Sequence, residues 1–242
     1  MRPFYRRELF RDEIITSMPK AHEIKIDLEN VKLELIRMEK GQSITLNSEG
    51  YEIGIILLSG SATVKMENFT AESIGGRKDV FSGKPTAVYI PCATQFEMKA
   101  VGYGILEVAL CKVKTEVKGK PFVINPDQIV VKEKGVFNWK RTVHEIFADQ
   151  DEAQEQCQLI IGETYGCPGQ WATYPYSQEE RSTIFFFKVK STHQKEVYVM
   201  RTTEDDKKYY IKNDTTLRID SSYAPIAEAE DAEVYYLWFL VK

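Results

Sequence analysis

Hydrophobic positions along the chain fall in short runs that stop at turn residues. Residues 53–58 are all apolar or glycine and end at Ser59-Gly60, and apolar positions resume at Ala62 and Val64. This spacing is typical of a strand, a tight turn and a second strand. Further apolar or alternating runs of strand length cover residues 105–110, 184–189, 197–200 and 234–241. Turn residues interrupt the runs at Gly75-Gly76, Gly83-Lys84-Pro85, Asn125-Pro126-Asp127 and Asn213-Asp214. Many short strands with such punctuation predict an all-β sandwich or barrel, and the best candidate for a short helix is residues 143–156.

The choice of aliphatic residues supports this prediction. Isoleucine and valine together number 39, against 13 leucines. Branching at Cβ restricts the first side-chain torsion, which disfavours helix and suits a pleated surface. With 242 residues, 12% aromatic and 28% charged, the chain is long enough for one large globular domain or two smaller ones.

A weak repeat relates the two halves of the chain. Residues 90–96 are followed by the run at 105–110, and residues 219–225 are followed by the run at 234–239, so that both pairs of segments are related by the same offset. That offset also lays residues 54–64 over 183–193. Two matching frames separated by about half the chain predict a duplicated β-domain. We therefore predict an N-terminal domain with an N-terminal arm over 1–120, a linker with a short helical segment over 121–150, and a C-terminal domain over 151–242. One large sandwich with coincidental spacing is the alternative.

Charge and targeting signals narrow the function classes. The formal net charge of −4 gives no strong field for nucleic acid or anionic membranes. The N-terminus lacks an apolar segment of signal-peptide length, and no window reaches 18 uninterrupted apolar residues. We expect a cytoplasmic protein whose four cysteines, Cys92, Cys111, Cys157 and Cys167, are free thiols, with two disulfides as the alternative. Exposed β edges and many aromatics predict a symmetric homo-oligomer.

Four strings resemble one enzyme family. Residues 76–85 read G-R-K-D-V-F-S-G-K-P, residues 135–143 read G-V-F-N-W-K-R-T-V, and residues 235–238 read Y-Y-L-W. Residues 162–164 read G-E-T, and residues 168–175 follow as P-G-Q-W-A-T-Y-P. Taken in chain order, the strings resemble the 5-deoxy-glucuronate isomerases of myo-inositol catabolism, which are similar to 4-deoxy-5-ketouronate isomerases. The resemblance implies a bicupin, in which one chain forms two jelly-roll (double-stranded β-helix) barrels.

The resemblance also implies aldose–ketose isomerisation of a sugar acid, which needs a base for the proton and an electrophile for the enediolate charge. The family's electrophile is expected to be a divalent metal held by three histidines and a glutamate in the C-terminal barrel. At the matching positions this chain has Ser177, Glu179, Ser182 or Thr183, and Ala224. Such a donor set is poor for a transition metal, so we expect neither a metal nor another cofactor. Only three histidines exist, His22, His144 and His193, and all fall elsewhere.

Other residues of the C-terminal half are candidates for binding and catalysis. Glu163 in the G-E-T string is the predicted base, and Glu179 and Arg181 are further catalytic candidates. Trp171, Tyr174, Tyr176 and Tyr223 are the predicted substrate-binding residues, because aromatic faces pack against sugar rings. The alternative is that Glu163 forms a salt bridge, with Arg141 as one possible partner, and that the aromatic side chains belong to the core.

Three functions follow from these residues. The chain is an isomerase-like protein that is catalytically impaired or works without the metal, using an electrophile such as Arg181 or Lys188. Alternatively, it is a non-catalytic sugar-binding or regulatory bicupin, or a structural partner of an active homologue. The missing ligands favour the sugar-binding protein over the isomerase, because fold alone does not establish activity.

Overall fold

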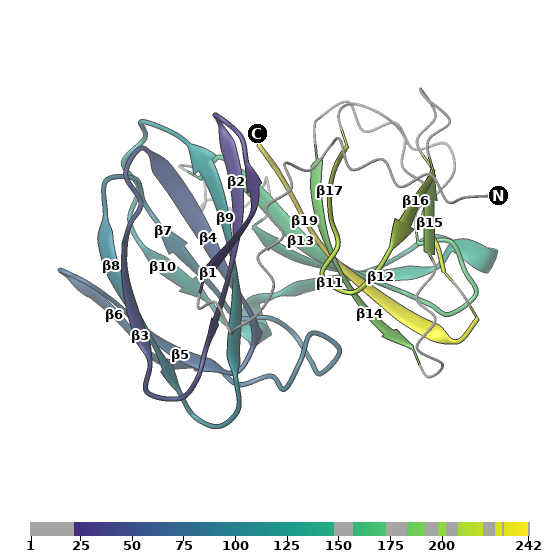
Figure 1. Ribbon diagram of the computed structural model, residues 1–242, viewed down its shortest axis with the longest axis horizontal. Coiled ribbons are helices and arrows are strands. Elements are labelled where there is room, and N and C mark those ends of the chain that lie inside the picture. The colour runs from purple at the N-terminus through teal and green to yellow at the C-terminus, as the bar shows by residue number, and fades with distance from the viewer. Residues whose placement is uncertain are drawn as a thin grey trace.

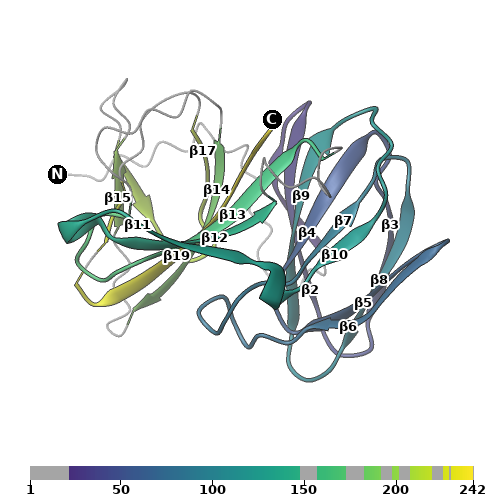
Figure 2. The same cartoon turned by 180° about the vertical axis from the view of Figure 1, so that it is seen from behind.

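The described residues form two β units that lie side by side (Figures 1 and 2). The computed structural model describes residues 22–147, 157–172, 183–191, 198–201, 208–219, 226–228 and 230–241. Within these ranges every regular element is a strand or a single 3₁₀ turn, and no helix is long and apolar enough to cross a membrane. The prediction of an all-β chain is confirmed.

The first unit packs a six-stranded sheet, of order β1-β2-β9-β4-β7-β10, against a four-stranded sheet, of order β3-β8-β5-β6. All pairings are antiparallel. Its strands are β1 (His22–Asp27), β2 (Val31–Met38), β3 (Ser43–Asn47), β4 (Tyr51–Ser59), β5 (Ser61–Met66), β6 (Phe69–Gly75), β7 (Ala87–Ile90), β8 (Gln95–Val101), β9 (Leu106–Lys114) and β10 (Phe122–Ile124).

The second unit is built around a six-stranded sheet of order β11-β12-β13-β19-β14-β17, with a three-stranded sheet of order β16-β15-β18. The 3₁₀ turn η2 (Pro126–Gln128) joins the units, and η3 (Phe137–Trp139) precedes β12. The strands are β11 (Val130–Lys134), β12 (Arg141–Phe147), β13 (Leu159–Gly166), β14 (Thr183–Ser191), β15 (Tyr198–Arg201), β16 (Lys208–Ile211), β17 (Thr216–Ile219), β18 (Ile226–Ala227) and β19 (Ala232–Val241).

Equivalent strands take equivalent places in the two large sheets. The order β1-β2-β9-β4-β7 in the first matches β12-β13-β19-β14-β17 in the second. The offset found in the sequence, which lays position 90 over position 219, carries both ends of β7 onto both ends of β17. The duplication is therefore visible in strand order and in spacing.

Two details of the predicted organisation change. Residues 143–147, expected to begin a short helix, instead form most of β12, because they pair with both β11 and β13. Sheet membership switches between Ile124 and Val130, so β11 and β12 belong to the second sheet although they fall in the expected linker.

The large sheet of the first unit is covered on both faces, which explains the unbroken apolar run of β4. Ile53, Ile55 and Leu57 pack with the four-stranded sheet in one core cluster. Ile56 and Leu58, on the alternate positions, belong to a second cluster that also contains Ile161 and Phe239 of the second unit. A Cβ atom on Gly54 would lie 2.5 Å from the Ile161 Cδ1 atom, so glycine lets β13 approach β4 closely. The two units thus share one hydrophobic core.

Polar contacts also join the units. The buried Glu52 carboxylate of β4 accepts hydrogen bonds from the backbone N–H groups of Gln158 (2.7 Å) and Leu159 (2.9 Å). Farther along the interface, Lys188 Nζ lies 2.9 Å from Glu107 Oε1 and 2.6 Å from Asp214 Oδ1. Lys188, which the sequence offered as an electrophile, is thus held in ion pairs at the interface between the units.

Candidate functional site in the second barrel

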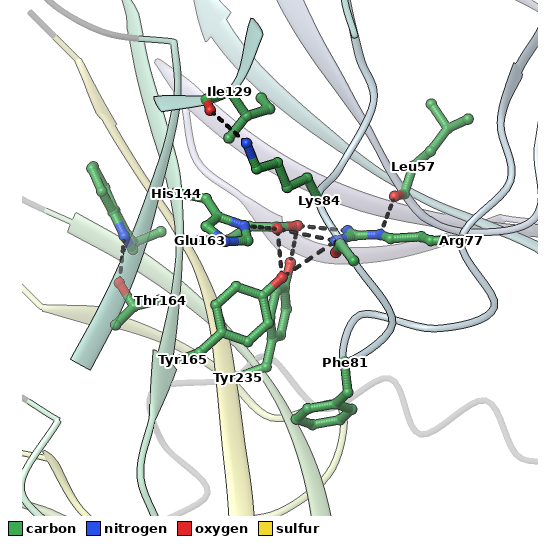
Figure 3. A network of polar contacts seen from close by, with 12 residues as sticks. Leu57, Arg77, Phe81, Lys84, Ile129, His144, Glu163, Thr164, Tyr165 and Tyr235 are labelled. Atoms are coloured by element: carbon green, nitrogen blue, oxygen red, sulfur yellow. Dashed lines mark hydrogen bonds and ion pairs between the residues drawn. The ribbon is translucent and has the colours of Figure 1, made fainter. Parts of the chain in front are cut away.

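Successive residues of β13 point to opposite faces of its sheet, so this strand separates two polar environments. Glu163 and Tyr165 face the first unit, whereas Gly162, Thr164 and Gly166 face the interior of the second barrel. Figure 3 shows Thr164 apart from the Glu163 contacts, with a hydrogen bond of its own. That bond comes from the indole N–H of Trp238 at 3.0 Å.

Glu163 is fully buried and is paired with Arg77 from the loop between β6 and β7 (Figure 3). The Arg77 Nη2 and Nη1 groups donate to the two carboxylate oxygens at 2.6 and 3.0 Å. The hydroxyls of Tyr235 (2.8 Å) and Tyr165 (2.9 Å) donate to the same carboxylate. Arg77 Nε donates to the Leu57 carbonyl at 2.9 Å, which fixes the guanidinium plane.

The electrostatics of this contact keep Glu163 ionised. Burial raises the pKa of its carboxyl, but the Arg77 charge and the hydrogen bonds from Arg77 and Tyr235, with His144 close by, outweigh burial and lower that pKa to about 2. A carboxylate with so low a pKa accepts protons poorly at neutral pH. The salt bridge that the sequence offered as an alternative is present, but its partner is Arg77 and not Arg141. The geometry favours a structural use of Glu163.

His144 lies on the same face as this pair. Its ring centroid is 4.7 Å from that of Tyr165, and its Nδ1 atom is 3.7 Å from Glu163 Oε2. The other described histidine, His22, contacts Glu34 in the first unit. Neither of these two imidazoles faces the interior of the second barrel.

Aromatic side chains fill the middle of that barrel. Phe187 and Tyr236 are buried in a core cluster, with Phe185 and Trp238 packed against them and partly exposed. Phe185 and Phe187 stack with centroids 6.1 Å apart. Beyond this aromatic layer, β13 ends at Gly166.

Buried polar groups without partners gather at that end. Among the described residues, buried side-chain nitrogen and oxygen atoms that make no hydrogen bond occur only between positions 141 and 228. Three of these side chains are set apart from the Gly166 end of the barrel. Asp214 lies close to the Lys188 charge and His144 lies close to the Glu163 charge. Thr216 is on β17, at the far edge of the sheet. The remaining three are Arg141 (Nη1), Gln170 (Oε1) and Glu228 (both carboxylate oxygens).

Backbone pairing relates these three groups to one another through Gly166 and Gln170. Arg141 is the cross-strand partner of Gly166, so its side chain leaves the sheet on the same side as a Gly166 Cβ would. The Glu228 carboxyl occupies that side, because a Gly166 Cβ would lie 1.5 Å from Glu228 Oε1. The Glu228 backbone N–H donates to the Gln170 carbonyl at 2.9 Å. We call Arg141, Gln170 and Glu228 the lumen cluster.

Glu228 is 8% exposed, and burial raises the pKa of its carboxyl to about 9. It therefore holds its proton at neutral pH and can donate a hydrogen bond. Arg141 supplies a positive charge, with its guanidinium 5.6 Å from the Trp139 ring. The arrangement suits an oxygen-rich anion, because it combines a cation, a neutral acid and an amide oxygen.

The residues predicted from sequence are only partly within the described ranges. Trp171 is 37% exposed and pairs with Ala227 through an isolated β-bridge. Its backbone therefore lies beside Gln170 and Glu228, which are the sequence neighbours of these two residues. Tyr174, Tyr176, Glu179, Arg181 and Tyr223 lie outside the described residues, as do Ser177, Ser182 and Ala224. Glu228 was not predicted because no local motif marks it, and Gln170, although it lies in the string of residues 168–175, was not singled out there.

Comparison with known proteins places the chain in context. A family model described as the KduI/IolB family matches residues 6–242. The 5-deoxy-glucuronate isomerase of Bacillus subtilis (strain 168) is 28% identical over 240 residues, covering 93% of this chain and 87% of the relative. The enzyme of the same name from Halalkalibacterium halodurans is 26% identical over 242 residues, covering 94% and 88%.

Solved structures agree on the fold. An IolB-like protein from Salmonella typhimurium LT2 superposes with a TM-score of 0.78 at 24% identity, covering 88% of this chain and 84% of the other. A cupin 2 conserved barrel domain protein from Leptotrichia buccalis gives a TM-score of 0.56 at 13% identity, covering 94% and 92%. The predicted bicupin, with two jelly-roll barrels, is confirmed.

Proposed function

Because this chain belongs to the KduI/IolB family, we propose that it binds a small sugar acid in the second barrel without the family's metal-dependent isomerisation. The observation that carries the proposal is the lumen cluster, whose buried donors and acceptors make no hydrogen bond to other described residues. A buried polar group without a partner costs stability, so it calls for an explanation such as a ligand. Relatives named 5-deoxy-glucuronate isomerase suggest deoxyuronates as the ligand class.

The donor set that the resemblance implies for a divalent metal does not fit this chain. His22 and His144 are engaged elsewhere, and the described residues contain no group of three histidine, cysteine, aspartate or glutamate side chains that could hold an ion. At the aligned positions, Ser177, Glu179, Ser182 or Thr183, and Ala224 offer one carboxylate, two hydroxyls and no imidazole. Transition metals select imidazole and thiolate ligands over such a set. No step of the proposed function uses a metal.

In this proposal the sugar acid binds with its carboxylate toward Arg141. Guanidinium groups pair with carboxylates through charge-assisted hydrogen bonds. Trp171, which is partly exposed beside the cluster, presents a ring face of the kind that packs on sugars. Tyr174, Tyr176 and Tyr223 stay predictions as further binding residues. Glu163 acts as the buried anion that holds Arg77, and so joins the two units.

Calorimetric titration tests the binding proposal. We expect 5-deoxy-D-glucuronate and D-glucuronate to bind and D-glucose, which lacks the carboxylate, to bind at least tenfold more weakly. Arg141→Met should weaken uronate binding by about tenfold or more. Lys190→Met is the matched control, because it removes an exposed cation of the same sheet, paired with Glu233, on the sheet face that carries Lys188 and not on the face toward the barrel interior. Failure of every sugar acid to bind would overturn the proposal.

A metal-independent isomerase is the second candidate. The neutral Glu228 carboxyl favours it, because an acid with a pKa of about 9 can protonate an oxygen or carbon at neutral pH. Glu179 and Arg181 remain the predicted base and electrophile of such a reaction. Isomerase turnover of 5-deoxy-D-glucuronate in the presence of a chelator would establish this candidate. Stoichiometric metal together with activity lost on chelation would instead contradict our interpretation of the ligand positions.

The symmetric homo-oligomer stays a prediction. Its best-suited surface is β11, the edge strand of the second sheet, where Val130 and Val131 are exposed and Phe137 lies exposed just beyond. Light scattering coupled to size-exclusion chromatography measures the oligomeric state. Val131→Lys should shift a β11-mediated dimer to monomer.

A further inference from the structure

The chemistry of Glu228 follows from where its carboxyl lies. Both oxygens are buried and make no hydrogen bond to another described residue. An ionised carboxylate without partners is very costly in a low-dielectric interior, so the group stays neutral instead. Burial accordingly raises the pKa of this carboxyl to about 9. A neutral carboxyl has one O–H donor and acceptor oxygens.

The residues around Glu228 determine which ligand groups its carboxyl could contact. Gly166 removes any side chain from the sheet surface beneath the carboxyl, and it is the position opposite Arg141. Gln170 adds an amide oxygen that accepts hydrogen bonds. A ligand that satisfies all three side chains needs an anionic group for Arg141, an acceptor oxygen for Glu228 and a hydroxyl for Gln170. A hydroxy acid such as a uronate carries all three.

We propose that Glu228 is a ligand-binding acid of the second barrel, whose buried carboxyl donates a hydrogen bond to an oxygen of a bound hydroxy acid, the carboxylate of which pairs with Arg141. This inference rests on the proposed function, because it concerns the same site. It adds a residue that the family strings do not contain and a dependence of binding on pH. Deprotonation of Glu228 would remove the donor and place a second negative charge beside the anionic ligand.

Other ionisable groups lie around Glu228. Burial, together with the charges of Glu228 and Glu133, raises the pKa of the Cys167 thiol. Burial raises the pKa of the Tyr236 hydroxyl well above its usual value. Arg141 remains charged throughout. Glu230, on the same segment as Glu228, is exposed. Between pH 7 and pH 9.5 the charge of the lumen cluster is therefore set mainly by Glu228.

Calorimetric titration with D-glucuronate at pH 7.0 and pH 9.5 tests the inference. The wild-type protein should bind at pH 7.0 and lose about tenfold in affinity at pH 9.5, as expected for the loss of a hydrogen bond to a charged ligand. Glu228→Gln keeps a neutral donor, so it should bind within about threefold of wild type at pH 7.0 and change little with pH. Glu230→Gln, the matched control, should retain the wild-type pH dependence.

Each other outcome has a defined meaning. If wild type binds and Glu228→Gln shows the same loss at pH 9.5, or if folded Glu228→Gln fails to bind at pH 7.0, the inference is wrong and the proposed function stands. If wild type binds no sugar acid at either pH, the proposed function fails and this inference fails with it. Infrared difference spectra provide a readout that needs no ligand: a protonated carboxyl band at pH 7.0 should be missing in Glu228→Gln, and its presence there would contradict the assignment.

Discussion

Arg77 and Glu163, which are 86 residues apart, face each other across the boundary between the two β units and share two hydrogen bonds of 2.6 and 3.0 Å. Both side chains are buried, so neither charge is solvated by bulk water. Such a pair contributes little by being present, but it is costly to break, because the remaining charge has no substitute partner. The stability of the first unit therefore depends on the second unit keeping Glu163 in place, because loss of Glu163 would leave Arg77 buried without its partner.

Arg77→Met should destabilise the protein strongly. It leaves Glu163 buried with only tyrosine hydroxyls as close donors, and loss of one partner from a buried pair costs about 3–5 kcal/mol. Urea unfolding followed by tryptophan fluorescence measures the change. Lys190→Met is the control, because the Lys190–Glu233 pair is 60% and 50% exposed and such surface pairs contribute about 0.5 kcal/mol. Equal effects of the two substitutions would contradict the structural role of Arg77.

The same pair predicts how stability changes with acid. The pKa of Glu163 is lowered to about 2 in the folded protein, whereas a free glutamate titrates at 4.5. The stabilisation is therefore complete above about pH 5 and disappears as the pH falls toward 2, at a total of roughly 3 kcal/mol. Urea midpoints measured from pH 6 to pH 3 should fall less steeply for Glu163→Gln than for wild type. Parallel slopes would exclude a strongly lowered pKa.

Glu228 predicts the opposite trend in the ligand-free protein. Its pKa is raised to about 9 by burial, against 4.5 in the unfolded chain. Stability should therefore decrease as the pH rises from 4.5 to 9, because the unfolded state releases the proton first. Glu228→Gln removes this dependence and should be more stable than wild type by on the order of 3 kcal/mol at pH 7. Thermal melts at pH 4.5 and pH 8 should show similar midpoints at the lower pH and a higher midpoint for the variant at pH 8.

Gly166→Ala should impair ligand binding without unfolding the barrel. The three atoms nearest to an added Cβ all belong to the Glu228 carboxyl, at 1.5 to 2.6 Å, so only that flexible side chain has to move. We expect uronate affinity to fall about tenfold, as expected for loss of one good hydrogen bond, with little change in melting temperature. Gly50→Ala is the control, because nothing lies within 4 Å of its added Cβ. Unchanged affinity in Gly166→Ala would remove Glu228 from the binding site.

The strands could be predicted from the sequence because their signals are local. The apolar runs at 53–58 and 184–189 lie within β4 and β14, and the repeat offset reproduces the spacing of β7 and β17. The helix expected from residue 143 failed because Val143 and its neighbours pair with strands on both sides, and this tertiary pairing outweighs a weak local pattern.

The site was harder to predict because its contacts are long-range. Glu163 stood out in the G-E-T string, yet its partner comes from the other unit, which no spacing in the sequence indicates. Glu228 lies in the string A-E-A-E-D of residues 227–231, which looks like a solvated acidic turn. Its burial requires the space that Gly166 leaves for its carboxyl, and Gly166 lies on a strand much earlier in the chain. Only folding brings these two positions together.

The hydrophobic core shared by β4 and β13 couples the folding and unfolding of the two units. Ile56, Leu58, Ile161 and Phe239 belong to one cluster, so neither half can bury its inner sheet without the other. A half-chain ending near Gln128 would expose this apolar face to water, and we expect it to aggregate. We therefore expect the two repeats to unfold together in a single melting transition, so that a destabilising change in either repeat lowers the stability of both.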